Sequence, residues 1–317
     1  MPDVSDQTTV VLDGSPSMTG LYARAFVGVA RSTLGRLPVP GLGGGSPGLP
    51  GSVLVLGDVE VQRERVIAYS RVCGFRLRDE SPPTYPHLLT FPLQMALMAS
   101  SDFPFPVVGL VHIANRIDQH RPVRAQERLD LTVWADGLRP HDRGTQVDLR
   151  AEVRVSDELA WESTSTYLHV ERSSAPAGDR EAAKPDGRRN GKGKRSAVSV
   201  PPPPRPPVTI WEIPGDIGRR YGDVSGDRNP IHLHTLSAKL FGMPRAIAHG
   251  MWLKARCLAA LEAHQPPALR AEVRFRLPVL LPSRVSFSAW PEGSAEQFSV
   301  RDRRGEKPHL DGSVAPL

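Results

Sequence analysis

The strongest constraint on how this chain folds is a break in its composition between Ala175 and Pro207. This stretch mixes Gly, Lys, Arg and Ser and then runs into four consecutive prolines, Pro201–Pro204. It has too few apolar side chains to order itself by burial, and the proline run favours a stiff extended spacer. A chain of 317 residues cut here leaves two pieces of ordinary domain size. We predict domains at residues 51–172 and 207–317, a linker at 173–206 and a weakly patterned segment at 1–50.

Both predicted domains carry the alternating pattern of β-strands. In the first, apolar residues occupy every second position over 129–135 and 147–155. In the second, the same alternation covers 271–277, and further strand-like stretches follow at 285–290 and 297–314. A period of two predicts strands with one buried face and one wet face, which is typical of antiparallel sheets.

One long helix is predicted in the second half, with a shorter counterpart in the first. Residues 251–264 are apolar nearly all round, so the helix should be buried within its domain, and residues 93–99 are its counterpart in the first half. The patterns therefore predict a central helix followed by antiparallel strands in each half. The predicted fold class is α+β, with two antiparallel sheets that each wrap around a central helix.

The halves also resemble one another. Tyr69–Gly74 matches Tyr221–Gly226 at an offset of 152 residues, and Pro122-Val123 matches Pro278-Val279 at an offset of 156. A nearly constant offset at two separate places indicates an internal duplication.

The charge distribution argues against nucleic acid as a partner. The formal net charge is +6, but residues 173–207 hold eight Lys or Arg against three Asp or Glu, so the rest of the chain is nearly neutral. The basic stretch has no interleaved aromatic residues on which bases could stack. We interpret it as a solvated linker.

The cysteine content and the hydropathy of the chain indicate the cellular compartment of the protein. Cys73 and Cys257 make no disulfide framework, and no Cys/His spacing indicates a metal site. The first residues show no secretory signal, and no apolar run approaches ~18 residues, the length of a membrane span. We expect a cytoplasmic protein with no membrane span, no metal and no cofactor.

The segment Tyr221–His232 carries the chemistry. Ile217, Tyr221 and Val224 have helical spacing, and Gly226 can end that helix. The residues that follow favour a rigid turn, in which Pro230 excludes further helix. Asp227 and His232 can then face one point, hold a water and pass protons at neutral pH. The alternative is a surface turn with an incidental histidine.

A second segment, Ala248–Met251, favours the chemical interpretation. It opens the predicted buried helix, where free backbone N–H groups point outward with the helix dipole behind them. Gly250 lets a ligand approach this backbone closely. Such donors stabilise a developing enolate oxygen.

Taken together, these residues resemble a known family. Residues 221–232, followed by Ala248–Met251, resemble the MaoC-like, (R)-specific enoyl-thioester hydratases, also called 3-hydroxyacyl-thioester dehydratases. Their motif, Ser-Gly-Asp-x-Asn-Pro-(aliphatic)-His, is matched without a gap at 225–232. The resemblance is close over 206–317. The first half, with Thr84–Pro86 and Phe91-Pro92, looks like the N-terminal hotdog of two-domain actinobacterial members, which implies a double hotdog fold.

The resemblance implies a role for each site residue. Asp227 and His232 bind and activate a water, and one of them returns a proton to the α-carbon, with the division between them left open. Asn229 orients this pair, and the Gly250 amide contacts the thioester oxygen. His249 sits beside that donor, and we favour a structural role for it.

The first half lacks the catalytic pair. After Gly74 it reads Phe75–Glu80, with no Asn-Pro and no His. The resemblance implies that this half accommodates the acyl chain. Its apolar segment at 93–111, with Met95 and Met98, fits that role, although core packing is the simpler explanation.

The predicted reaction is the reversible hydration of trans-2-enoyl thioesters to (R)-3-hydroxyacyl thioesters in fatty acid metabolism. The carrier is coenzyme A or an acyl carrier protein, and Arg245 and Arg276 are candidate phosphate contacts. A hotdog thioesterase and a non-catalytic acyl-thioester-binding subunit are the alternatives. The assembly stays open between a single chain and a homodimer.

Overall fold

The structure is a computed structural model that describes residues 8–23, 48–170 and 209–317. The predicted linker at 173–206 lies outside the described residues. None of the helices in these three ranges is long and apolar enough to cross a membrane.

Strands dominate both halves. The elements of the first half are β1 (Thr8–Val11), a helical turn at 18–23, β2 (Ser52–Glu60), α2 (Arg63–Cys73), α3 (Tyr85–Met98), β3 (Leu110–Gln119), β4 (Arg128–His141), β5 (Gly144–Val155) and β6 (Glu158–Val170). Those of the second half are β7 (Thr209–Ile213), α4 (Ile217–Ser225), α5 (Pro230–Leu233), α6 (Thr235–Leu240), α7 (Gly250–Ala260), η2 (Glu262–His264), β8 (Leu269–Phe275), β9 (Ser283–Glu292), β10 (Ala295–Asp302) and β11 (Pro308–Pro316).

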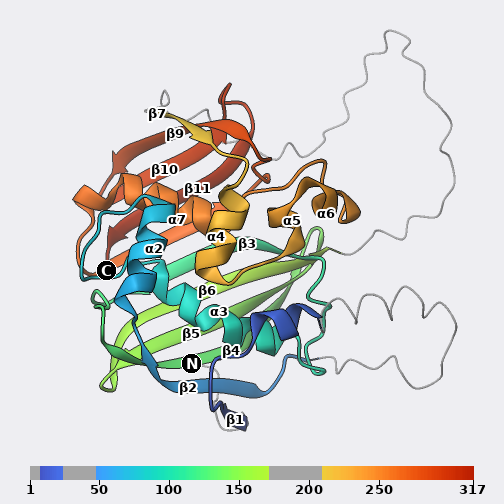
Figure 1. Cartoon of the computed structure of the whole chain (residues 1–317), viewed down its shortest axis with the longest axis vertical. Coiled ribbons are helices and arrows are strands. Elements are labelled where there is room, and N and C mark those ends of the chain that lie inside the picture. Colours follow the sequence, from blue (N-terminus) through green and yellow to red (C-terminus); the bar gives the residue numbers. More distant parts are fainter. Residues whose placement is uncertain (1–7, 24–47, 171–208) are drawn as a thin grey trace, which may run out of the picture.

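The strands form one continuous sheet. Its eleven strands run in the order β1-β2-β4-β5-β6-β3-β8-β11-β10-β9-β7, and helices α2, α3, α4 and α7 lie on one face of it (Figure 1). Within each half the pairing is antiparallel, apart from β1, which joins β2 in parallel. The α+β double hotdog is confirmed, and the two predicted sheets meet edge to edge because β3 pairs with β8. This pairing covers the edge strand of each half.

The two copies of the duplicated segment are neighbours in space. Helices α2 and α4 pack side by side, with the rings of Tyr69 and Tyr221 6.1 Å apart. Both helices end at a glycine in the left-handed conformation, with φ of 86° at Gly74 and 76° at Gly226. The positive φ explains why glycine recurs at this position in both copies.

Helix α7 is the core helix of the second half. The predicted single helix at 251–264 is divided, because regular helix stops at Ala260 and a 3-10 turn follows. Lys254, in the middle of α7, is fully buried. Its ammonium donates to the backbone oxygens of Asn115, at 3.3 Å, and Ala271, at 2.9 Å, and to the Asn115 side chain. Lys254 therefore joins α7 to both β3 and β8.

An ion cluster lies at the same strand pair. The Asp118 carboxylate on β3 accepts hydrogen bonds from Arg116, with Nε at 3.0 Å, and from Arg270 on β8, with Nε at 2.8 Å. Only 4% of the Asp118 side chain is exposed. Burial raises the pKa of Asp118, but the two guanidinium groups outweigh burial and hold that pKa below its ordinary value.

We expect Asp118→Asn to lower the free energy of unfolding at pH 7 by about 2 kcal/mol, the scale of hydrogen bonds to a charged group. The pKa of Asp118 is depressed in the folded state, so its contribution is full above the unfolded pKa. It is lost as the pH falls through the folded pKa. Urea unfolding of wild type and variant should therefore converge at acid pH. Asp79→Asn is the control, since the Asp79 side chain is 70% exposed in its ion pair with Arg63. A difference that persists unchanged at acid pH would contradict this account.

A glycine face on α4 lets the chain fold back against this helix. A Cβ on Gly218 would lie 1.9 Å from the carbonyl oxygen of His232, and one on Gly222 would lie 3.0 Å from that of Asp227. No side chain fits in the first space. The spacing of the two glycines therefore sets where the segment after α4 can lie.

We expect Gly218→Ala to displace His232 and to lower both stability and the rate of any reaction that uses that residue. Overpacking of this kind costs about 1–3 kcal/mol. The matched control is Gly215→Ala, because a Cβ there meets Pro282 at an ordinary 3.7 Å. Thermal unfolding and the chemical shifts of His232 report the two effects. A Gly218→Ala protein with the wild-type melting temperature and an unmoved His232 would refute the argument.

Candidate active site

The segment after α4 forms the turn that presents Asp227. The backbone N–H of Asp227 donates to Ser225 Oγ at 3.1 Å. Asn229 caps α5, because its Oδ1 accepts from the Ile231 N–H at 3.3 Å. The prediction that Pro230 excludes helix was wrong, since Pro230 is the first residue of α5. A proline is tolerated there because the first N–H of a helix has no partner within it.

His232 lies on α5 with its ring orientation defined. Its Nδ1 lies 2.9 Å from the carbonyl oxygen of Ile247. A carbonyl only accepts, so Nδ1 carries the proton and Nε2 keeps a lone pair. The segment that carries the Ile247 carbonyl is itself held by backbone hydrogen bonds. The Ile247 N–H donates to the carbonyl oxygen of Ile231 at 3.1 Å, and the Ala248 N–H donates to that of Val279 at 2.9 Å. The sequence predicted this residue, and the structure shows which nitrogen is available.

His249 sits between the turn and α7. Its Nε2 donates to the backbone oxygen of Asp227 at 3.0 Å. The ring is 2% exposed and stacks on His232, with centroids 3.7 Å apart, while Tyr221 lies 4.9 Å away on another side. These contacts fit the structural role favoured from the sequence, because His249 holds both Asp227 and His232.

The Asp227 carboxylate converges with these histidines. Its Oδ1 accepts from the Asn229 N–H at 3.2 Å and from the hydroxyl of Tyr22, and 23% of the side chain is exposed. One carboxylate oxygen of Asp227 and one ring nitrogen from each of His232 and His249 lie within 4.8 Å of one another. Two hydrogen bonds of ordinary length, each about 2.8 Å, span such a gap, so one water can bridge these groups. The spacing would also admit a metal ion.

The environment sets the charge of each group. Burial raises the pKa of Asp227, but the neighbouring histidines and the hydrogen bonds from Tyr22 and Asn229 outweigh it and place the pKa below its ordinary value. Burial lowers the pKa of His232, and it lowers that of His249 to about 3, helped by His232. At neutral pH the site therefore holds one carboxylate and two neutral imidazoles.

Gly250 begins α7 beside this cluster. The first N–H groups of a helix have no acceptor within it, and the helix dipole favours a negative oxygen in front of them. A Cβ on Gly250 would lie 3.0 Å from the ring of Phe275 on β8. That ring lies 5.0 Å from His112, which stacks on Tyr167 at 4.6 Å. Aromatic side chains from both halves therefore lie beside the start of α7.

The remaining predicted residues play other parts. Leu93, Met95 and Met98 are buried in the core, which fits the simpler explanation of that segment. Arg276 donates to Asp311 at 2.9 Å, and Arg245 to the carbonyl of Pro282 at 3.3 Å. Both arginines are at the surface and stay candidates for phosphate contact.

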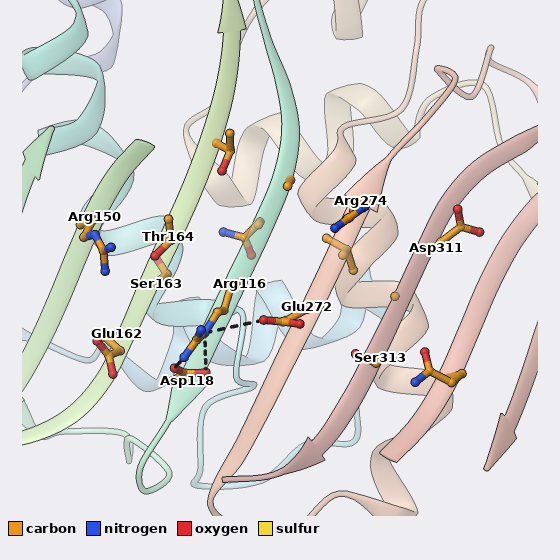
Figure 2. A pocket seen from close by; sticks show the side chains of 16 residues that line it. Arg116, Asp118, Arg150, Glu162, Ser163, Thr164, Glu272, Arg274, Asp311 and Ser313 are labelled. Carbon is orange, nitrogen blue, oxygen red and sulfur yellow. Dashed lines mark hydrogen bonds and ion pairs between the residues drawn. The ribbon is translucent and has the colours of Figure 1, made fainter. Parts of the chain in front are cut away.

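A pocket of about 520 Å³ lies elsewhere, over the middle of the sheet. Figure 2 shows it lined by strands, with helices behind them, and neither Asp227 nor His232 reaches it. Its Arg116 is paired with Asp118 and lies 3.8 Å from Glu272. Because these charges satisfy one another, the pocket offers no catalytic pair.

Two features of the site were missed from the sequence. One is Tyr22, which lies in the segment described as weakly patterned. The other is the glycine face of α4, although Gly218, Gly222 and Gly226 recur at intervals of four residues. That interval places small residues on one side of a helix and was the available signal.

Comparison with known proteins places this geometry in a family. A family model described as a MaoC like domain matches residues 196–312. The 3-hydroxyacyl-thioester dehydratase X of Mycobacterium tuberculosis is 36% identical over 269 residues, which cover 85% of this chain and 91% of that protein. The crystal structure of HtdX from the same organism superposes with a TM-score of 0.70 at 34% identity, over 84% of this chain and all of that one. A MaoC-like dehydratase from Phytophthora capsici, at 17% identity and a TM-score of 0.65, covers 84% of this chain and 95% of its own and shares the fold.

The match to dehydratase X extends through both halves rather than the motif alone, since it takes in most of each chain. The fold, the motif at 225–232 and this relative agree. The chain belongs to the MaoC-like dehydratase family.

Proposed function

We propose that the chain is a hydro-lyase that adds water to trans-2-enoyl thioesters and removes it from (R)-3-hydroxyacyl thioesters. The observation that carries this proposal is the convergence of Asp227 and His232 beside the start of α7, with a carboxylate oxygen and a ring nitrogen within 4.8 Å of each other. A relative that is 36% identical carries the name 3-hydroxyacyl-thioester dehydratase, which supports it.

In the hydration direction, Asp227 and His232 hold one water. The water oxygen bonds to the β-carbon of the enoyl group, and the pair takes up one water proton. The electrons of the double bond move to the thioester oxygen, where the Gly250 N–H stabilises the enolate. The pair then returns a proton to the α-carbon, so the product contains all the atoms of one water. Asn229 and His249 fix the geometry of the pair.

Several further points belong to the same proposal. The second half supplies the reacting groups, and the first half accommodates the acyl chain. The carrier is coenzyme A or an acyl carrier protein, and Arg245 and Arg276 are candidates for binding its phosphate groups.

In the first half, the turn after α2 packs against η2. The Arg76 N–H in this turn donates to the Glu262 carboxylate at 2.9 Å.

The decisive experiment assays the purified protein on trans-2-enoyl-CoA substrates of graded chain length. The proposal expects loss of the enoyl absorbance without release of thiol, and a product of R configuration. Thiol release would indicate a thioesterase instead. Binding without either change would indicate a non-catalytic acyl-binding protein.

The catalytic pair gives a specific prediction. Asp227→Asn removes the charge while keeping the size, and His232→Gln removes the proton acceptor. Each should lower the hydration rate by about 10²–10⁴-fold, the usual contribution of a general acid or base. Groups that act on one water are not additive, so the double variant should be scarcely slower than either single one.

The pH dependence of the wild-type rate should also identify His232. Its pKa is lowered, so the rate should hold from neutral pH to below 6.5 and fall at more acid pH as the ring protonates. His232→Gln should lose that inflection. Near-normal rates in both single variants would reduce the motif to a structural turn.

Substitutions at Gly250 test the proposed role of the N–H groups at the start of α7. Gly250→Val should lower the rate by about 10² or more, the effect of losing one oxyanion donor. Because a Cβ here meets Phe275, the variant also strains the packing. Both substitutions keep the N–H, but Gly250→Ala combined with Phe275→Leu adds a smaller side chain and makes room for it, so this variant should be faster than Gly250→Val. Wild-type turnover in a folded Gly250→Val protein would remove Gly250 from the site.

A further inference from the structure

A tyrosine from the N-terminal segment reaches the candidate active site. Tyr22 lies on the helical turn at 18–23 (dark blue in Figure 1), and its hydroxyl donates to Asp227 Oδ1, although the two residues are 205 positions apart. We infer that Tyr22 is a positioning residue for the hydration reaction. It holds Oδ1 of Asp227 and so leaves Oδ2 for the water. This inference rests on the proposed function.

Packing holds Tyr22 in this place. Upstream, β1 pairs with β2, and the Leu12 N–H donates to Val55 at 2.8 Å. On the helical turn itself, Leu21 is 5% exposed and belongs to the hydrophobic core. Met18 lies 3.6 Å from the point where a Cβ on Gly226 would stand. The segment therefore lies across the turn that carries Asp227.

The hydrogen bonds around the carboxylate give Tyr22 its function. Asp227 Oδ1 accepts from Tyr22 and from the Asn229 N–H, which also donates to the Tyr22 oxygen. Two donors from different segments fix one carboxylate oxygen, so the carboxylate cannot rotate without breaking both bonds. The other oxygen, Oδ2, lies 3.8 Å from His249 Nε2. It faces the histidine cluster and is the oxygen left to accept from water.

Tyr22 acts as a donor and not as an exchanger of protons. Burial raises its pKa far above the ordinary value, and the nearby Asp227 charge raises it further. The phenol therefore stays protonated across the working pH range of an enzyme. Its contribution is to orient Asp227 and to favour the ionised carboxylate.

The kinetic test compares Tyr22→Phe with wild type and with Tyr85→Phe. The control removes the hydroxyl of another buried tyrosine, which packs against Tyr69 in the first half. Tyr22→Phe should lower kcat by about 10-fold or more, the loss of one hydrogen bond to a charged group, with little change in KM. A kcat equal to that of wild type or of Tyr85→Phe, or a loss that lies in KM instead of kcat, overturns the inference.

An unfolding experiment tests the contact without turnover. Tyr22→Phe should lower the urea midpoint in the wild-type background and leave it nearly unchanged in the Asp227→Ala background, where the acceptor is gone. An equal fall in both backgrounds overturns the contact. If wild type fails to hydrate any enoyl-CoA, the proposed function fails, while this cycle still decides whether Tyr22 holds Asp227. If wild type hydrates and the cycle shows no coupling, the inference about Tyr22 alone fails.

Discussion

A buried ammonium group joins the two halves of this molecule. Lys254 reaches from the core helix α7 to the strands β3 and β8, where it donates to three oxygens, two of them backbone carbonyls. Burial lowers its pKa well below the ordinary value, and the three acceptor oxygens replace part of the hydration that the group loses. The position of α7 over the strand pair depends on this contact. Gly250 begins this helix and His249 precedes it, so the contact of His249 with the turn at Asp227 depends on where α7 lies.

Asp227 and His232 are held in place by contacts with backbone atoms. His249 holds the Asp227 carbonyl, the Ile247 carbonyl holds the His232 ring, and Gly218 admits the His232 carbonyl against α4. Each of these contacts involves a backbone atom, so the placement of Asp227 and His232 follows from the path of the chain. Rigid placement of a water and of the donors at a helix start is what catalysis by positioning requires.

The sequence predicted the fold class and brought together the residues that the structure finds adjacent, because both rest on local patterns. Period-two alternation identifies strands, and the motif at 225–232 lies within one turn and one short helix. It did not predict the joining of the sheets, the burial of Lys254 or the contact between Tyr22 and Asp227. These depend on residues far apart in the chain: Lys254 and Asn115 are separated by 139 positions, and Tyr22 and Asp227 by 205. No local period records such a contact, and a lysine within an apolar helix gives no sign of its acceptors.

The pairing of β3 with β8 has one more consequence. Two hotdogs that associate as separate chains would come apart on dilution, and their active site would come apart with them. Here both partners belong to one chain, so each meets the other at an effective concentration set by the connecting segment and not by the solution. The halves are free to differ, since neither has to serve as its own partner. One half can keep the Asp227 motif while the other diverges in sequence, and β3 still finds β8 at any dilution.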